Sequence, residues 1–224
     1  MQHKPLYNIT PFTLLDYPDH LAAIFWFARC NMRCVYCYNR DIVFGKGERS
    51  EEEAIAFLKS RTGLLEAVVL SGGEATLYEN LPAFCKKIRQ LKFKIKLDTN
   101  GLNPEMIRRL IKENLVDYIA LDYKAPKERY CTITKDKHFD RFSKTLNFLI
   151  SQAFPFEVRT TVHNDLLGAE EINHIIKDLV KRGYTGTYYL QPFVFSEHTI
   201  GRVKPAQSSF DQSLLSSDLK VVWR

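Results

Sequence analysis

No run of apolar residues in this chain is long enough to cross a membrane. The longest, at residues 21–28, falls far short of the roughly 20 residues that a membrane-spanning helix requires. The opening Met-Gln-His-Lys-Pro also lacks the apolar stretch of a secretory signal. We therefore expect a cytoplasmic protein that has no membrane partner.

Cysteine is scarce, and its distribution excludes a second class of protein. The chain has 5 cysteines, an odd number, and three of them crowd one short segment. A secreted disulfide framework has an even set of well-separated cysteines. This pattern instead favours a reducing compartment and a metal or cluster site.

Acidic residues are the minority among the charges, with 26 against 32 basic residues and a net charge of +6. Such an excess can serve nucleic acid or an acidic protein partner. The basic residues are spread along the chain and form no block, so we expect no nucleic-acid partner. The densest group, Lys92, Lys94 and Lys96, alternates with apolar residues, which predicts a strand with one solvated face.

Apolar runs alternate with amphipathic segments over most of the chain. Strands are predicted at residues 21–28, 67–71, 94–98, 118–122, 156–162 and 187–192. This alternation predicts an α/β fold with a parallel sheet, and too few units for a full eight-unit barrel. A partial (β/α)6 barrel or an open sheet remains. We expect one domain over residues 1–224, with a core at about 20–194 and a C-terminal extension at about 195–224.

Helix start signals lie between the predicted strands. Ser50 followed by Glu53 forms a capping box. Asn80 is predicted to cap a helix with Pro82 in its first turn, and Asn103-Pro104 opens another helix. Two further helices are predicted at residues 139–151 and 169–182, the latter ended by Gly183.

Polar side chains gather near the ends of these strands. They are Glu74, Asp98, Thr99, Asp122, Lys124, Arg159, Thr161 and Gln191. In parallel barrels the carboxyl ends of the strands carry the active site. The crowded cysteines follow the first strand, so we expect them at the same mouth.

The crowded cysteines are Cys30, Cys34 and Cys37, followed by Tyr38 and Asn39. A structural zinc site or a complete cysteine-ligated cluster normally has four protein ligands. Three thiolates therefore predict a [4Fe–4S] cluster with one iron open to another ligand. A zinc site completed by a histidine is the alternative, although no histidine lies within the loop. The remaining cysteines, Cys85 and Cys131, have no ligand spacing around them, and we expect neither to be catalytic.

The cysteine spacing and the Ser71–Glu74 segment together resemble the radical S-adenosylmethionine (SAM) superfamily. The segments at residues 97–101 and 121–124 resemble motifs of its glycyl-radical-enzyme activases. The segment at residues 9–18 is most similar to activating proteins of the anaerobic ribonucleoside-triphosphate reductase. The resemblance runs from about residue 8 to the sixth predicted strand. Ala75 departs from it, because many members have proline there.

The resemblance implies a set of binding residues for the cluster and for SAM. The cysteines ligate the cluster and form the catalytic centre, and the backbone of Tyr38 contacts the adenine. Gly72, Gly73 and Glu74 receive the amino group of SAM. Viewed without the resemblance, Tyr38 is a candidate buried aromatic residue, and paired glycines often mark only a turn.

The carboxylate of SAM has its own implied partners. Lys124 and Arg159 bind it, and a monovalent cation beside it is held by Asp98, Thr99, Asp122 and the main chain near Ala120. Surface aspartates, helix caps and ordinary salt bridges are the alternatives for these side chains. We expect structural roles for His138, His163, His174 and His198.

The implied activity is reductive cleavage of SAM and removal of a glycine α-hydrogen from a partner enzyme, the anaerobic ribonucleoside-triphosphate reductase. Flavodoxin or ferredoxin is the expected electron donor. The alternatives are activation of another glycyl radical enzyme, of the pyruvate formate-lyase type, or chemistry on a small molecule, as in a deazapurine synthase. A non-catalytic iron–sulfur or zinc protein is a further class.

Overall fold

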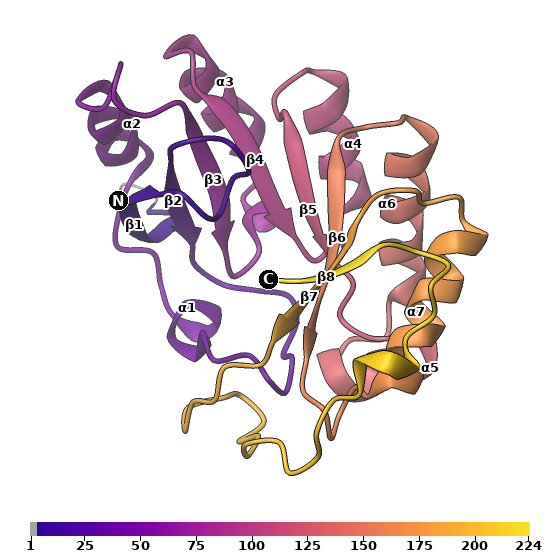
Figure 1. Ribbon diagram of the computed structural model, residues 1–224. Coiled ribbons are helices and arrows are strands. Elements are labelled where there is room, and N and C mark those ends of the chain that lie inside the picture. The colour runs from indigo at the N-terminus through magenta and orange to yellow at the C-terminus, as the bar shows by residue number, and fades with distance from the viewer. Residues whose placement is uncertain (1–3) are drawn as a thin grey trace. The chain divides into compact units, whose positions relative to one another are not determined.

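The computed structural model describes residues 4–224 and contains a mostly parallel sheet of eight strands with intervening helices (Figure 1). The strands lie in chain order: β1 (Leu6–Thr13), β2 (Ala22–Phe27), β3 (Ala67–Gly72), β4 (Lys94–Thr99), β5 (Tyr118–Asp122), β6 (Phe156–Val162), β7 (Tyr188–Pro192) and β8 (Val221–Trp223). All six predicted strands are present, so the predicted α/β class is confirmed and a partial barrel is consistent with it. The prediction missed β1 and β8.

The helices and 3-10 turns are α1 (Arg40–Phe44), α2 (Glu51–Lys59), η1 (Ala75–Leu77), α3 (Leu81–Gln90), α4 (Pro104–Lys112), α5 (Lys127–Thr134), α6 (Phe139–Ser151), α7 (Ala169–Lys181) and η2 (Gln212–Leu214). The chain divides into two compact units. The first comprises residues 4–31, 41–99 and 103–119, and the second comprises residues 32–40, 100–102 and 120–224. The single domain expected over residues 1–224 stays a prediction.

In the first unit, β1 pairs antiparallel with β2, while β2, β3 and β4 run parallel. Helix α3 packs against both α2 and β4 (Figure 1). Aliphatic and small residues on one face of β2 and β3, among them Ile24 and Val69, form a buried apolar cluster that Tyr17 covers. Most residues of β2 and β3 are buried whichever way they point, and burial on both faces is typical of a parallel sheet between other layers.

Local capping chemistry explains where the helices begin. The predicted capping box at Ser50 and Glu53 is confirmed, and the Asn103 side chain accepts a hydrogen bond from the Met106 N–H. Asn80 does not cap α3 with its side chain, contrary to the prediction. Its amide instead donates to the buried Glu51 carboxylate at 2.7 Å, because that carboxylate needs donors to offset its burial.

In the second unit, β6, β7 and β8 run parallel. The predicted C-terminal extension supplies β8, and its β-branched residues pair with β7 from Tyr188↔Val221 onward. The Asn173 side chain on α7 ties down the connection, since it donates to the Leu214 carbonyl at 2.8 Å and accepts from the Ser216 N–H. The extension is therefore an integral part of this unit.

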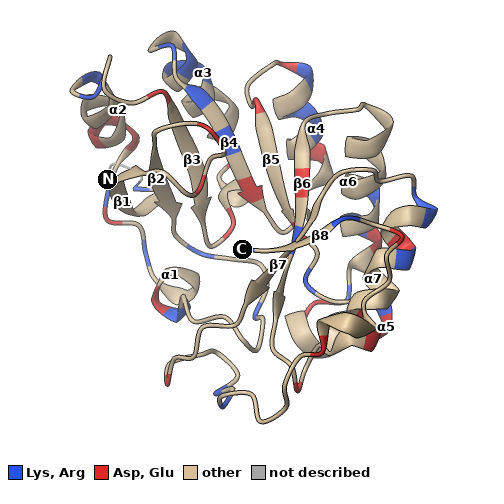
Figure 2. Ribbon diagram, in the orientation of Figure 1, with Lys and Arg blue, Asp and Glu red and all other residues tan. Residues whose placement is uncertain are grey.

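Charged residues are interspersed along the helices of each unit, with basic and acidic positions alternating over short distances (Figure 2). Throughout residues 4–224, no helix combines the length and the apolar character that a membrane crossing would need. The sequence prediction was wrong for one charged residue. Lys96, expected on a solvated strand face, is 0% exposed, because β4 is covered on both faces at that point.

Candidate functional site

The chain leaves β2 and enters the cysteine loop (residues 30–37) through a tight turn in the first unit. Arg29 adopts a left-handed conformation with φ of 71°, and its N–H donates to the Ile42 carbonyl at 2.8 Å. The Ala28 N–H donates to the Pro5 carbonyl at 3.0 Å. Backbone bonds on both sides of the turn therefore hold the residue that precedes Cys30.

The remainder of the cysteine loop lies in the second unit, where several backbone hydrogen bonds hold it. The Cys37 N–H donates to the Cys34 carbonyl at 3.0 Å. The C-terminal end of α5 receives the N–H groups of Arg33 and Val35, at 2.9 Å each. Ile200 and Gly201, in the C-terminal segment, donate to the carbonyls of Cys37 and Val35. The sequence offered no signal for this last pair of contacts.

None of the five cysteines, all of which lie in the described residues 4–224, forms a disulfide, and they differ in burial. Cys34 is buried, and Cys30 and Cys37 are half-buried. Cys85 is fully buried in α3, where burial raises the pKa of its thiol to about 12, as suits a small apolar core residue. Within the described part of the chain, no three His, Cys, Asp or Glu side chains form a ready metal site. The cluster ligands therefore stay a prediction from spacing.

Positive charge from Lys124 reaches the cysteines of the second unit. Burial raises the pKa of the Cys37 thiol, while a hydrogen bond from the Asn39 backbone and the charge of Lys124 oppose that rise. Burial by itself would lower the pKa of Lys124, but the charges of Asp122, Tyr36 and Cys34 outweigh it and raise that pKa well above its ordinary value. Lys124 is thus a permanent cation that favours the thiolate form nearby.

The two glycines at the end of β3 permit a close backbone approach in the first unit. Gly72 has φ of 113°, and a Cβ there would lie 2.5 Å from the Phe27 nitrogen. A Cβ on Gly73 would lie 1.9 Å from the Arg29 oxygen and 3.2 Å from the Cys30 nitrogen. The glycines therefore bring the end of β3 against the entry to the cysteine loop, which a simple turn would not require.

Glu74 is 2% exposed and acts as a buried hydrogen-bond acceptor. Its Oε1 accepts from the Thr76 N–H at 3.2 Å, the Thr76 hydroxyl at 2.6 Å and the Thr99 hydroxyl at 2.8 Å. The first of these bonds caps η1, which begins at the buried Ala75. The carboxylate thereby joins the end of β3 to the end of β4.

Asp98, at the end of β4, has a partner that the sequence reading placed in solvent. Lys96 Nζ lies 2.6 Å from one carboxylate oxygen, and the Ser71 hydroxyl donates to the other at 3.1 Å. Along β4 a basic section passes into an acidic one (Figure 2). Lys96 and Asp98 are two residues apart and so share a strand face, which is the signal that could have revealed this pair.

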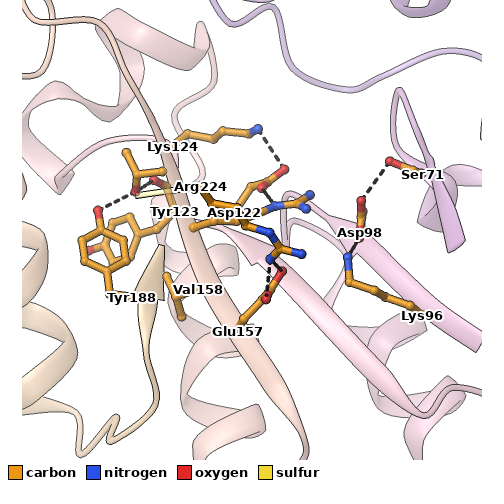
Figure 3. A network of polar contacts seen from close by, with 12 residues as sticks. Ser71, Lys96, Asp98, Asp122, Tyr123, Lys124, Glu157, Val158, Tyr188 and Arg224 are labelled. Carbon is orange, nitrogen blue, oxygen red and sulfur yellow. Dashed lines mark hydrogen bonds and ion pairs between the residues drawn. The ribbon is translucent and has the colours of Figure 1, made fainter. Parts of the chain in front are cut away.

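Asp122, Lys124 and Arg159 form one cluster in the second unit. Lys124 Nζ lies 2.9 Å from one oxygen of Asp122, and Arg159 Nε lies 2.6 Å from the other. Figure 3 shows Lys124 extending toward Asp122. Burial would raise the pKa of Asp122, but the charges of Arg159 and Lys124 hold it well below its usual range. The cluster thus places two cationic side chains on one carboxylate.

Tyr38 is 52% exposed, so it is not a buried core aromatic residue. Its exposure leaves it accessible to a ligand, and its role in adenine binding stays a prediction. Residues that the sequence reading missed are Ser71, Lys96, Ile200 and Gly201. The partners of Ser71, Ile200 and Gly201 come from another part of the chain, whereas Lys96 was misplaced because the burial of its strand face is not encoded locally.

The chain is similar in sequence to known proteins. The radical SAM superfamily pattern matches residues 24–182. A Methanocaldococcus jannaschii protein, provisionally named a glycyl-radical enzyme activating enzyme, is 31% identical over 180 residues, covering 76% of this chain and 73% of that protein. A Thermoplasmatales archaeon S-adenosylmethionine-dependent nucleotide dehydratase is 31% identical over 103 residues, covering 45% of this chain and 36% of the dehydratase.

Solved structures share the fold. Streptococcus suis SuiB bound to S-adenosylmethionine has a TM-score of 0.64 and 14% sequence identity, covering 81% of this chain and 44% of SuiB. The chain thus spans less than half of SuiB and of the dehydratase, and the likeness to SuiB concerns the fold alone. The superfamily match covers most of the chain, and it implies a [4Fe–4S] cluster and SAM as cofactors. The chain belongs to the radical SAM superfamily and is an enzyme with radical SAM chemistry.

Proposed function

We propose that this enzyme activates a glycyl radical enzyme, and that its partner is the anaerobic ribonucleoside-triphosphate reductase. The observation that carries the proposal is the 31% identity to the Methanocaldococcus jannaschii protein over 73% of that protein's length. The segment at residues 9–18 supports the choice of partner, because it resembles activating proteins of this reductase. A flavodoxin or ferredoxin is the proposed electron donor.

In this proposal, Cys30, Cys34 and Cys37 ligate the cluster. Three thiols that form no disulfide, on a loop held by backbone hydrogen bonds, suit that role. The cluster and SAM, when bound, supply an electron and a carbon radical that can remove a hydrogen atom from a glycine. The protein's share is to bind and orient these groups.

The other predicted residues have complementary tasks in this proposal. Gly72 and Gly73 keep the end of β3 close to the cysteine loop, so that their carbonyls are available to the amino group of SAM. Lys124 and Arg159 attract the carboxylate of SAM, because both side chains are cationic and converge on Asp122. Arg159 adds the flat, forked donor geometry that matches a carboxylate.

Anaerobic reconstitution tests the chemistry with a matched pair of cysteine variants. The wild type is expected to bind about four irons per chain and to form 5′-deoxyadenosine from SAM under reductant. Cys34→Ala is expected to abolish that product, whereas Cys131→Ala, at an exposed position outside the cysteine loop, is expected to retain it. Full SAM cleavage by the Cys34→Ala protein would overturn the ligand assignment.

Electron paramagnetic resonance decides the partner. The reconstituted enzyme is mixed under reductant with an anaerobic ribonucleotide reductase or, separately, with a pyruvate formate-lyase. A glycyl-radical doublet from the reductase alone is the expected result. A doublet from the lyase alone would contradict the choice of partner and retain the activase class. SAM cleavage that modifies a nucleotide and yields no doublet with any glycyl radical enzyme would contradict the class itself.

A further inference from the structure

Lys96 and Asp98 form an ion pair in the interior of the first unit. The lysine side chain is 0% exposed, and its Nζ lies 2.6 Å from Oδ1 of Asp98. The other carboxylate oxygen accepts a hydrogen bond of 3.1 Å from the Ser71 hydroxyl. Figure 3 shows the lysine and the serine directed at opposite oxygens of the same carboxylate. The carboxylate is therefore engaged on both sides.

The surroundings of Lys96 are apolar. Its register partner on β3 is Val69, which belongs to the buried cluster that includes Ile24 and Ala67. A lone ammonium in such a place would be costly, and so would a lone carboxylate. The ion pair offsets this cost for both charges, and it fixes where the Asp98 carboxylate lies.

The family resemblance assigned a monovalent cation to Asp98 and Thr99, together with Asp122 and the main chain near Ala120, and Asp98 does not fit that assignment. Asp98 already has a cationic partner, because Lys96 Nζ lies 2.6 Å from its Oδ1. A metal ion on Oδ1 of Asp98 would face the Lys96 ammonium at short range. Like charges in a buried site repel strongly, so one of the two cations would be excluded.

We propose that the Lys96 ammonium is the resident cation of this site and that SAM binding by this enzyme requires no monovalent metal ion. Lys96 is a positioning residue: through Asp98 it holds Ser71, which directly precedes the glycine pair at the end of β3. The inference depends on SAM binding, which the superfamily implies, and is independent of the identity of the partner enzyme.

Calorimetric titration of SAM into the reconstituted wild type tests the proposal without a variant. The titrations use KCl, NaCl or choline chloride at the same ionic strength, and the melting temperature is recorded in each salt. The Kd for SAM is expected to agree within about twofold in all three salts, and no salt should raise the melting temperature specifically. A Kd that is about tenfold weaker in choline chloride would overturn the proposal.

Removing the lysine should create the cation requirement that the wild type lacks. In choline chloride, Lys96→Met is expected to bind SAM about tenfold more weakly, and KCl or NH4Cl should restore much of the loss. Lys94→Met is the matched control, because Lys94 lies on the same strand and is exposed. It should bind SAM like the wild type in every salt.

A neutral double variant keeps the test decisive if Lys96→Met does not fold. Lys96→Met/Asp98→Asn removes both charges, and such exchanges of a buried pair are often tolerated. It should fold and bind SAM weakly in all three salts, since no carboxylate remains to attract a cation. SAM binding at wild-type strength by either Lys96 variant in choline chloride would overturn the proposal.

Discussion

The N–H of Gly201 donates a 2.8 Å hydrogen bond to the carbonyl oxygen of Val35, in the middle of the cysteine loop. A Cβ at position 201 would lie 2.7 Å from the Cβ of Val35 and 2.9 Å from its oxygen. Only glycine allows the two segments to approach this closely. A segment without a recognisable motif thus supports the loop that carries the predicted cluster ligands.

Gly201→Val is therefore expected to loosen the cysteine loop and to accelerate cluster loss. The valine side chain cannot fit against Val35, so the hydrogen bond must break. Absorbance of the reconstituted protein in the presence of a chelator measures the rate of cluster loss, which should rise several-fold. Gly168→Ala is the control, because its Cβ would meet only ordinary contacts, the nearest at 3.5 Å. Equal rates of cluster loss for the two variants would contradict the support role of Gly201.

Gly73→Ala is expected to prevent cluster assembly. Its Cβ would lie 1.9 Å from the Arg29 backbone oxygen, and backbone cannot move aside as a flexible side chain can. Iron content after anaerobic reconstitution should fall well below about four per chain, and the melting temperature should drop. Gly63→Ala is strained because Gly63 has φ of 80°, but its Cβ would meet no atom within 4 Å. The Gly63→Ala protein should keep its iron. Loss of iron from both variants would mean that backbone strain, without the clash at Arg29, is enough to prevent cluster assembly.

Asp122→Asn is expected to lower the free energy of unfolding by about 3 kcal/mol, because it takes a counter-ion from two mostly buried cations. The pKa of Asp122 lies below its ordinary value in the folded protein. Its contribution is therefore complete above about pH 5 and is lost as the pH falls through the folded-state pKa.

Urea unfolding of wild type and Asp122→Asn at several pH values measures this contribution. The wild type should lose more stability than the variant between about pH 5 and pH 3, so the two curves should converge. Asp19→Asn is the control, since Asp19 is exposed and asparagine tolerates its φ of 62°. If the free energies of unfolding of wild type and Asp122→Asn changed in parallel with pH, the charge of Asp122 would not be the source of the difference in stability.

Ser50→Ala is expected to destabilise the protein by about 1 kcal/mol through loss of a helix cap. The Ser50 hydroxyl accepts from the Glu53 N–H at 3.3 Å, and the Ser50 N–H donates to the Glu53 carboxylate at 2.7 Å. Thermal unfolding measures the difference. Ser60→Ala, at the exposed C-terminal end of the same helix, should change stability less. A larger effect at Ser60 would show that the cap is not what stabilises α2.

Local signals were sufficient for most of the secondary structure. Helix α6 and strands β5 and β6 begin and end where the sequence places them, because their apolar periodicity and flanking turns are encoded within a few residues. Strands β1 and β8 were missed for the opposite reason. They are edge strands with many exposed or half-buried residues, so their apolar pattern is weak, and they form only by pairing with β2 and β7.

Some features of the candidate site were also predictable from local sequence, and others were not. Three cysteines within one short loop, followed by a glycine pair after the next strand, are local patterns, and they were sufficient to predict radical SAM chemistry. Lys96 was misplaced because an alternating charged and apolar strand predicts the same periodicity whether its second face meets solvent or another layer. Which of the two it meets is decided by elements elsewhere in the chain.

The sequence by itself therefore determined the chemistry, because the residues that define it are neighbours along the chain and their spacing survives any arrangement of the rest. Tertiary structure alone decided which charges neutralise one another and which backbone supports the cysteine loop. Arg159 with Asp122 and Gly201 with Val35 are pairs that packing creates, and packing buries the local pair of Lys96 with Asp98. Burial gives these pairs their strength, since a charge or a polar backbone group removed from water must find its partner within the protein.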